Sequence, residues 1–188
     1  MQNEIQNEIV RRRDMRDVFT FTIDPADAKD FDDALSFEIE SADPAVYRIG
    51  VHIADVSFYV RPETKVDDDA YQRGTSVYLV DRVLPMLPEE LCNDKCSLRP
   101  NEDKLCMSVI FTMDSDAHVL KHKICRTVIC SNARLNYDEA QEIIESPDRF
   151  ADRRVIPRNK NPQHPRSETS GRTDSQRRTH HRAGRNAF

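Results

Sequence analysis

Asp24-Pro-Ala-Asp-Ala-Lys-Asp-Phe-Asp-Asp-Ala34 is the stretch that decides how this chain is interpreted, because it holds five carboxylates in eleven residues. It follows an alternating segment at 18–23, which predicts a strand, and leads into the apolar segment 34–39, which predicts another. Carboxylates packed this closely repel one another. A hard divalent cation reverses that effect, since Mg²⁺ or Mn²⁺ takes oxygen ligands at about 2.0–2.6 Å. The stretch therefore predicts a metal site suited to phosphoryl chemistry.

Two other kinds of acidic segment have a similar composition. A solvated acidic loop is the default for an Asp-rich stretch, but a loop that directly follows a strand is a common place for functional residues. A calcium loop of the EF-hand type requires a glycine after its third acidic position and a glutamate at its twelfth. The nearest match, 30–33, lacks both the glycine and the register, so the EF-hand is rejected.

Three further motif regions follow in order along the chain. They are Tyr47–Val60, Arg73–Tyr78, and Leu84–Leu91 leading into Cys96–Glu102. Together with Phe21–Leu35, which contains the acidic stretch, they resemble the RNB catalytic domain of the ribonuclease II and ribonuclease R family, and they are most similar to the ribonuclease R branch. The resemblance extends over roughly residues 11–149. It implies a partial RNB domain, the N-terminal half only.

The resemblance implies a hydrolytic 3′→5′ exoribonuclease that uses Mg²⁺, or alternatively Mn²⁺, and releases nucleoside 5′-monophosphates from single-stranded RNA. The family's four signature aspartates fall on the positions Asp24, Asp30, Asp32 and Asp33. All four are implied metal ligands, and Asp32 and Asp30 are the implied catalytic residues. In a two-metal scheme one ion generates the attacking hydroxide and the other stabilises the leaving 3′ oxygen. Asp27 is an extra acid within the spacing and is assigned no role.

Tyr78 matches the aromatic residue with which the family stacks on the terminal base. Stacking tolerates every base, which suits a nuclease that removes all four nucleotides. Without the motif, a lone tyrosine between Val77 and Leu79 would be interpreted as a core aromatic. His52 and Asp55 lie in one of the motifs but are interpreted as structural, hydrogen-bonded residues.

Charge is distributed unevenly along the chain. Residues 153–188 carry a net charge of +8, whereas the rest carries −13, so bulk charge on the body does not attract RNA. The sequence predicts a polar basic leader at 1–16, a partial RNB domain at 17–150 and a disordered basic tail at 151–188. The tail is interpreted as unrelated to the family, as after a frameshift or truncation, with a nucleic-acid-binding arm as the alternative.

The predicted fold class is mixed α/β and strand-rich. Strands are expected at 18–23, 35–39 and 46–53, and a hairpin is expected from 106–113 and 119–130. Helices are expected at 66–74, with Val66, Ala70 and Tyr71 facing inward, and at 136–144, where Asn136 and Glu139 form a capping pattern.

The remaining composition favours a reduced, cytoplasmic environment. The five cysteines are an odd number and lack a second pair at zinc-ligand spacing, so free thiols are expected. No stretch approaches the roughly 18 apolar residues of a membrane span. No protein partner is indicated, and the family resemblance implies a monomer. The alternative functions are an inactive fragment that binds divalent metal or RNA weakly, and an RNA-binding protein that uses the basic tail.

Overall fold

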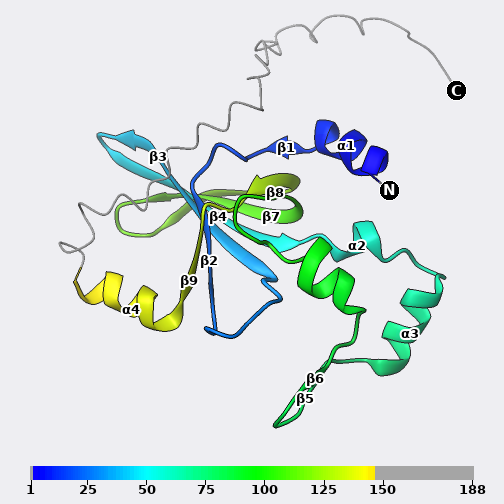
Figure 1. The fold of residues 1–188 in the computed structure, drawn as a ribbon. Helices are drawn as coiled ribbons and strands as arrows, with labels where there is room; N and C mark the ends of the chain where they lie inside the picture. The colour runs from blue at the N-terminus through cyan, green and yellow to red at the C-terminus, as the bar shows by residue number, and fades with distance from the viewer. Residues whose placement is uncertain (1, 147–188) are drawn as a thin grey trace, which may run out of the picture. The chain divides into compact units, whose positions relative to one another are not determined.

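The computed structural model describes residues 2–146 of the chain. They form a mixed α/β, strand-rich fold around one seven-stranded sheet, which confirms the predicted fold class (Figure 1). The elements in chain order are α1 (Gln2–Arg11), β1 (Arg13–Asp14), β2 (Thr20–Asp24), β3 (Asp33–Ala42), β4 (Ala45–Ala54), α2 (Val56–Tyr59), α3 (Lys65–Arg73), β5 (Val77–Tyr78), β6 (Val83–Leu84), the π-helical turn η1 (Leu91–Lys95), β7 (Asp103–Asp114), β8 (Val119–Cys130), β9 (Ala133–Asn136) and α4 (Tyr137–Glu145). The tail predicted at 151–188 lies outside the described residues, so its disorder stays a prediction.

The sheet has the strand order β1-β8-β7-β4-β3-β2-β9. Neighbouring strands are antiparallel except at the two edges, where β1 pairs with β8 and β9 with β2 in parallel. The long hairpin predicted from the alternating segments is confirmed as β7 and β8. The acidic stretch connects the end of β2 to the start of β3, which are adjacent strands of the sheet.

The two faces of the sheet differ in a way that simple hydrophobicity does not predict. The buried face carries mostly small and polar side chains. Among its members are Thr20, Thr22, Ser36, His52, Cys106, Ser108 and Thr127. The opposite face carries large apolar side chains, most of which are only half-buried or exposed among the described residues. This set includes Phe37, Ile39, Ile49, Val51, Ile53, Met107 and Ile124.

Loops rather than long helices cover the buried face. The main core cluster brings Met15 and Phe31, from the segments on either side of β2, onto Cys96 and Leu98, which follow η1. Leu98 is fully buried and Phe31 is 6% exposed. Phe31 belongs to the acidic stretch, so that stretch is anchored in the core by its own aromatic side chain.

A buried chain of hydrogen bonds crosses the small-residue face. His52 Nδ1 lies 2.7 Å from Ser108 Oγ and His52 Nε2 lies 2.9 Å from Ser36 Oγ. Ser108 Oγ continues the chain to Thr127 Oγ1 at 2.6 Å. A Cβ at Gly50 would lie 2.3 Å from Ser36 Oγ, so only glycine fits beside this chain. These contacts give His52 the structural role predicted from the sequence.

We expect His52 to make the stability of the fold depend on pH. Burial lowers the pKa of His52 from 6.5 to about 4, so the unfolded state binds more protons between these values. The contribution of His52 is therefore complete above pH 6.5 and falls by about 3 kcal/mol as the pH approaches 4. Urea denaturation at several pH values would show a weaker acid dependence in His52→Gln than in the wild type. The exposed His122→Gln variant is the control, and equal slopes in wild type and His52→Gln would contradict the expectation.

The N-terminal segment is more ordered than a solvated leader. It forms α1, and Ile9 packs on Leu105 and Val128 in a second core cluster. Arg12 follows the helix and is 7% exposed. Its guanidinium Nη2 lies 2.6 Å from Asp55 Oδ2, so this arginine of the N-terminal segment forms a buried ion pair. Such a distant partner leaves no local pattern in the sequence.

The two predicted helices are confirmed as α3 and α4. Asn136 and Glu139 form the reciprocal capping box at the start of α4. In α3, Ala70 is buried as expected, but Tyr71 is 89% exposed, so its predicted inward orientation is wrong. None of the described helices is long and apolar enough to cross a bilayer.

Candidate metal and RNA site

The four signature aspartates lie along the connection between β2 and β3. Asp24 is the last residue of β2 and Asp33 is the first residue of β3. Asp24 is 9% exposed and Asp30 is half-buried, whereas Asp32 and Asp33 are exposed. The chain thus presents one buried carboxylate beside a group of more accessible ones.

The buried carboxylate of Asp24 is strongly affected by its surroundings. Burial raises the pKa of Asp24, and the charges of Asp33 and Asp30 raise it further. The Thr22 hydroxyl and the guanidinium of Arg134 act in the opposite direction. Asp24 Oδ2 is buried and has no hydrogen-bond partner within residues 2–146. An unpaired buried carboxylate oxygen is costly, and a cation would compensate for that cost.

Asp32 shares this electrostatic environment. Partial desolvation raises the pKa of Asp32, and the charges of Asp30, Asp33 and Asp24 add to the shift. The charges of Asp30 and Asp33 therefore act on both Asp24 and Asp32. Asp27 is absent from the charges that act on Asp24 and Asp32, and its side chain is exposed.

The backbone of the acidic stretch is fixed from one side by residues after η1. Ser97, which is fully buried, accepts a hydrogen bond from the Phe31 amide at 3.0 Å and donates to the Lys29 carbonyl at 2.9 Å. The Leu98 amide donates to the Phe31 carbonyl at 2.8 Å. The Ala54 amide donates to the Asp32 carbonyl at 2.9 Å. The positions of Asp30 and Asp32 are thus determined by contacts with distant segments.

Arg134 of β9 also holds the acidic stretch in place. Its Nη2 atom donates to the carbonyls of Pro25 at 3.0 Å and Ala26 at 2.6 Å. Its guanidinium carbon lies 5.0 Å from the centre of the Phe31 ring. Nothing in the sequence around Arg134 pointed to this role, because its contacts lie more than a hundred residues away along the chain.

The fit to a divalent cation rests on the donor set. Within residues 2–146 no three His, Cys, Asp or Glu side chains converge as a preformed metal cage. The carboxylates nevertheless lie close enough to shift one another's protonation, and one buried oxygen is unpaired. Oxygen-only donors with incomplete protein ligation suit Mg²⁺, which keeps several waters and binds substrate phosphates. The residues therefore fit such an ion.

Two cysteines lie near the acidic stretch: Cys92 lies within η1, and Cys96 directly follows it. Burial raises the pKa of Cys96 to about 11, and the charge of Asp32 adds to the shift. Burial also raises the pKa of Cys92, with a contribution from Asp30. Both thiols are protonated at neutral pH, so they are poor metal ligands there.

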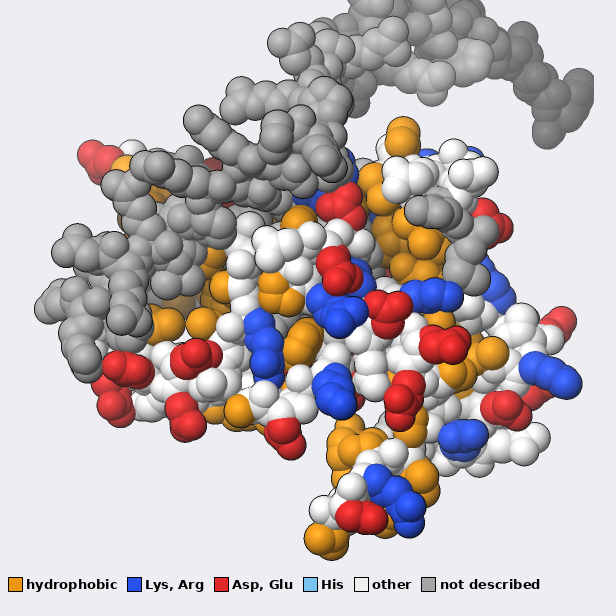
Figure 2. All heavy atoms as spheres, in the orientation of Figure 1, with side chains coloured by type: hydrophobic (Ala, Val, Ile, Leu, Met, Phe, Trp, Pro, Cys, Tyr) orange, Lys and Arg blue, Asp and Glu red, His pale blue; other side chains and the backbone are white. Residues whose placement is uncertain are grey.

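Tyr78 lies on a small hairpin that projects from the rest of the described chain (Figures 1 and 2). The hairpin consists of β5 and β6, paired as Val77 with Leu84 and Tyr78 with Val83. Tyr78 is 72% exposed, so it is not the core aromatic of the alternative interpretation. No hydrogen bond or ion pair in the described part of the chain joins it to the four aspartates.

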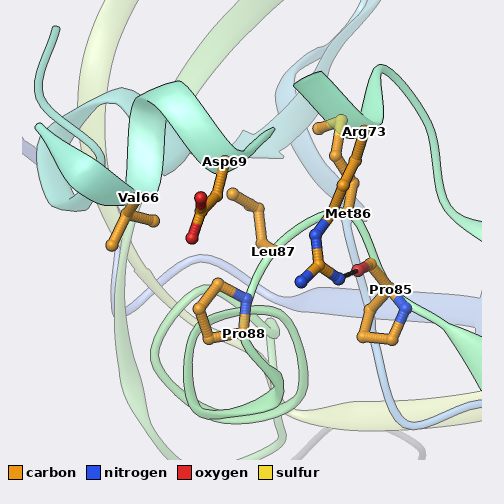
Figure 3. Close-up of a pocket in the computed structure, with 7 residues that line it drawn as sticks. All are labelled: Val66, Asp69, Arg73, Pro85, Met86, Leu87 and Pro88. Atoms are coloured by element: carbon orange, nitrogen blue, oxygen red, sulfur yellow. Dashed lines mark hydrogen bonds between the residues drawn. The ribbon is translucent and has the colours of Figure 1, made fainter. Parts of the chain in front are cut away.

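The base of this hairpin is anchored to α3. Arg73 Nη1 donates to the Pro85 carbonyl at 3.0 Å, and the Ser76 hydroxyl accepts from the Met86 amide at 2.9 Å. A cavity of about 210 Å³ lies between α3 and the segment after the hairpin (Figure 3). Its lining comprises Val66, Asp69, Arg73, Pro85, Met86, Leu87 and Pro88.

Comparison with known proteins gives a family. The sequence matches the RNB domain over residues 12–182. This chain belongs to the RNB domain family. Ribonuclease R of Aquifex aeolicus is 49% identical over 139 residues, which are 74% of this chain and 19% of that protein. The matched range extends past residue 150, the position at which the sequence analysis places the end of the RNB domain. Residues 147–188 lie outside the part of the chain that the structure describes.

Solved structures agree with the family. Mycoplasma genitalium RNase R in complex with ribose-methylated single-stranded RNA has a TM-score of 0.69 and 29% identity, covering 76% of this chain and 22% of that one. Yeast Ssd1, described as a pseudonuclease, has a TM-score of 0.67 at 21% identity over 74% of this chain and 17% of its own. The second likeness concerns the fold alone. This RNB chain spans about a fifth of the length of the curated relatives that it matches.

Proposed function

We propose that this chain carries the metal-binding site of a 3′→5′ exoribonuclease acting on single-stranded RNA in the cytoplasm. The supporting observation is the buried, unpaired Oδ2 atom of Asp24. The same acidic stretch holds Asp30, Asp32 and Asp33, whose charges act within this group. The ribonuclease R names of its relatives support the same reaction class. The product is a nucleoside 5′-monophosphate.

The roles proposed for the aspartates follow from their placement. Asp24 and Asp33, which end β2 and begin β3, hold Mg²⁺ or Mn²⁺, and Asp30 completes the ligation or orients the other ligands. Asp32 also binds metal, and its carboxylate orients the attacking water and accepts its proton. The raised pKa of Asp32 suits proton acceptance. When bound, the cation supplies an activated water and stabilises charge on the leaving 3′ oxygen.

The direct test is RNA hydrolysis by the purified chain. A 5′-labelled single-stranded RNA should shorten stepwise from its 3′ end with Mg²⁺ and stay intact with EDTA. A circular RNA of the same sequence, which has no 3′ end, should resist. No shortening by a chain that is folded by circular dichroism would contradict the enzymatic proposal.

A second candidate function is an inactive chain that binds divalent metal or RNA weakly. The observation that favours it is the lack, within residues 2–146, of three acidic side chains converged for a metal. The pseudonuclease Ssd1 shows that the fold also occurs in a protein described as lacking nuclease function. Saturable Mn²⁺ binding without hydrolysis would support this alternative.

We expect Tyr78 to contribute to RNA binding by stacking. Tyr78→Ala should weaken binding of a short single-stranded RNA by about 5- to 150-fold, because one stacked base is worth about 1–3 kcal/mol. Tyr78→Phe should bind like the wild type. Tyr71→Ala is the matched control, since Tyr71 is an exposed tyrosine on the neighbouring α3. Fluorescence anisotropy would measure all four affinities, and an unchanged affinity in Tyr78→Ala would contradict the assignment.

A further inference from the structure

Two buried side-chain oxygens have no hydrogen-bond partner within residues 2–146, and they lie on the same strand. They are Thr22 Oγ1 and Asp24 Oδ2 of β2. Thr22 is 1% exposed and Asp24 is 9% exposed. Residues two apart on a strand project from the same face, so the hydroxyl and the carboxylate are neighbours on the buried side of the sheet. Unsatisfied buried polar groups are rare in native proteins, so two together require an explanation.

The polar neighbours of this pair are already engaged. In the parallel pairing with β9, Thr22 is opposite Arg134 and Asp24 is opposite Asn136. Arg134 donates to backbone carbonyls of the acidic stretch, and the Asn136 side chain caps α4. Within residues 2–146, neither side chain forms a hydrogen bond to the two oxygens. The hydroxyl of Thr22 can rotate and carries one donor, while a carboxylate oxygen only accepts.

We propose that Thr22 is a positioning residue for the metal site, whose hydroxyl donates to the Asp24 carboxylate and holds it in the orientation in which it binds the cation. This inference rests on the proposed function, because it takes Asp24 as a metal ligand. Hydrogen bonds to ligating carboxylates fix their orientation, and their loss typically weakens metal binding by about 10- to 100-fold.

The competing explanation is that Thr22 serves only as a β-branched strand residue. Val keeps that shape and branching but lacks the hydroxyl, whereas Ser keeps the hydroxyl and loses a methyl group. Under the structural explanation, Thr22→Val binds metal normally. Under the proposal, Thr22→Val stays folded, because Val keeps the shape of the side chain, but it binds metal more weakly.

The experiment compares the full chain with Thr22→Val, Thr22→Ser and Thr20→Val. Thr20 is the matched control, since it is fully buried on the same face of β2 and its hydroxyl donates to the Val18 carbonyl at 2.9 Å. The readouts are the Mn²⁺ dissociation constant by calorimetry and the rise in melting temperature caused by Mg²⁺. Thr22→Val should bind about tenfold more weakly and lose most of the rise. Thr22→Ser and Thr20→Val should stay close to the wild type.

Two results would overturn the role of Thr22 and leave the metal site standing. They are normal Mn²⁺ binding by Thr22→Val, and equally weakened binding by Thr22→Val and Thr22→Ser. A wild-type chain that binds no Mn²⁺ would instead overturn the metal site itself, and the inference with it.

Discussion

Asp32→Asn should abolish metal-dependent RNA hydrolysis while RNA binding is retained. The amide keeps the shape of the carboxylate but cannot carry its charge or accept a proton from water at neutral pH. A positioned proton acceptor is worth about 10²- to 10⁴-fold in rate, and lost metal ligation adds to this. RNA affinity should not fall, because the substitution removes a negative charge from a site that holds phosphates.

The matched control for this substitution is Asp27→Asn in the same stretch. Asp27 is exposed and is not among the charges that act on Asp24 or Asp32. Its substitution should leave the rate of shortening of a 5′-labelled RNA unchanged. Equal loss of hydrolysis and RNA binding in Asp32→Asn would contradict the proposed role, as would equal activity of the two variants.

Arg12→Met should destabilise the fold by about 3–5 kcal/mol, since it leaves the buried Asp55 carboxylate without its cationic partner. The side chains of Arg12 and Asp55 are 1% and 3% exposed and are joined at 2.6 Å. Arg12 also donates to the Cys106 carbonyl at 3.2 Å. Although burial alone would raise the pKa of Asp55, hydrogen bonds from Ser57 and Arg12 hold it below its usual value. That stability is present at neutral pH and is lost as the pH falls through the lowered pKa.

Urea denaturation of a small set of variants measures this effect. Arg13→Met is the control, because Arg13 is the exposed neighbour on β1. The double variant Arg12→Met with Asp55→Leu should recover much of the loss, since it removes both charges. A loss under about 1 kcal/mol in Arg12→Met, as is typical of surface pairs, would show that the pair contributes little. Asp55 follows directly after Ala54, whose amide holds the Asp32 carbonyl, so the pair also supports the acidic stretch.

Strand positions follow from the sequence, but the choice of the buried face does not. Alternation in 46–53 predicts β4 and puts Tyr47, Ile49, Val51 and Ile53 on one face. That face is the more exposed one in the described structure, and the side that carries His52 is buried instead. Periodicity reports which residues share a face, whereas burial depends on what other segments cover it. The packing of Phe31 and Leu98 against the small face is a long-range contact without a local signature.

For the candidate site, the sequence points to the aspartates but not to the residues that hold them in place. The family resemblance implies that Asp24, Asp30, Asp32 and Asp33 act together, and the charges of Asp30 and Asp33 do act on Asp24 and Asp32. The supporting residues were not predicted, because their partners are distant along the chain. Ser97 and Thr22 lie inside family motifs, whereas Arg134 lies outside them. The hairpin of β5 and β6 was also missed, since two-residue strands are too short to show alternation.

The most direct test of the metal site is anomalous X-ray diffraction from crystals of the chain grown with Mn²⁺. The expected result is a peak about 2.0–2.6 Å from carboxylate oxygens of Asp24 and Asp33, with Asp30 or Asp32 beside it. Asp24→Asn crystals grown in the same way should lose the peak. A well-ordered acidic stretch with no peak, or a peak only at other residues, would contradict the assignment of these aspartates to a divalent cation.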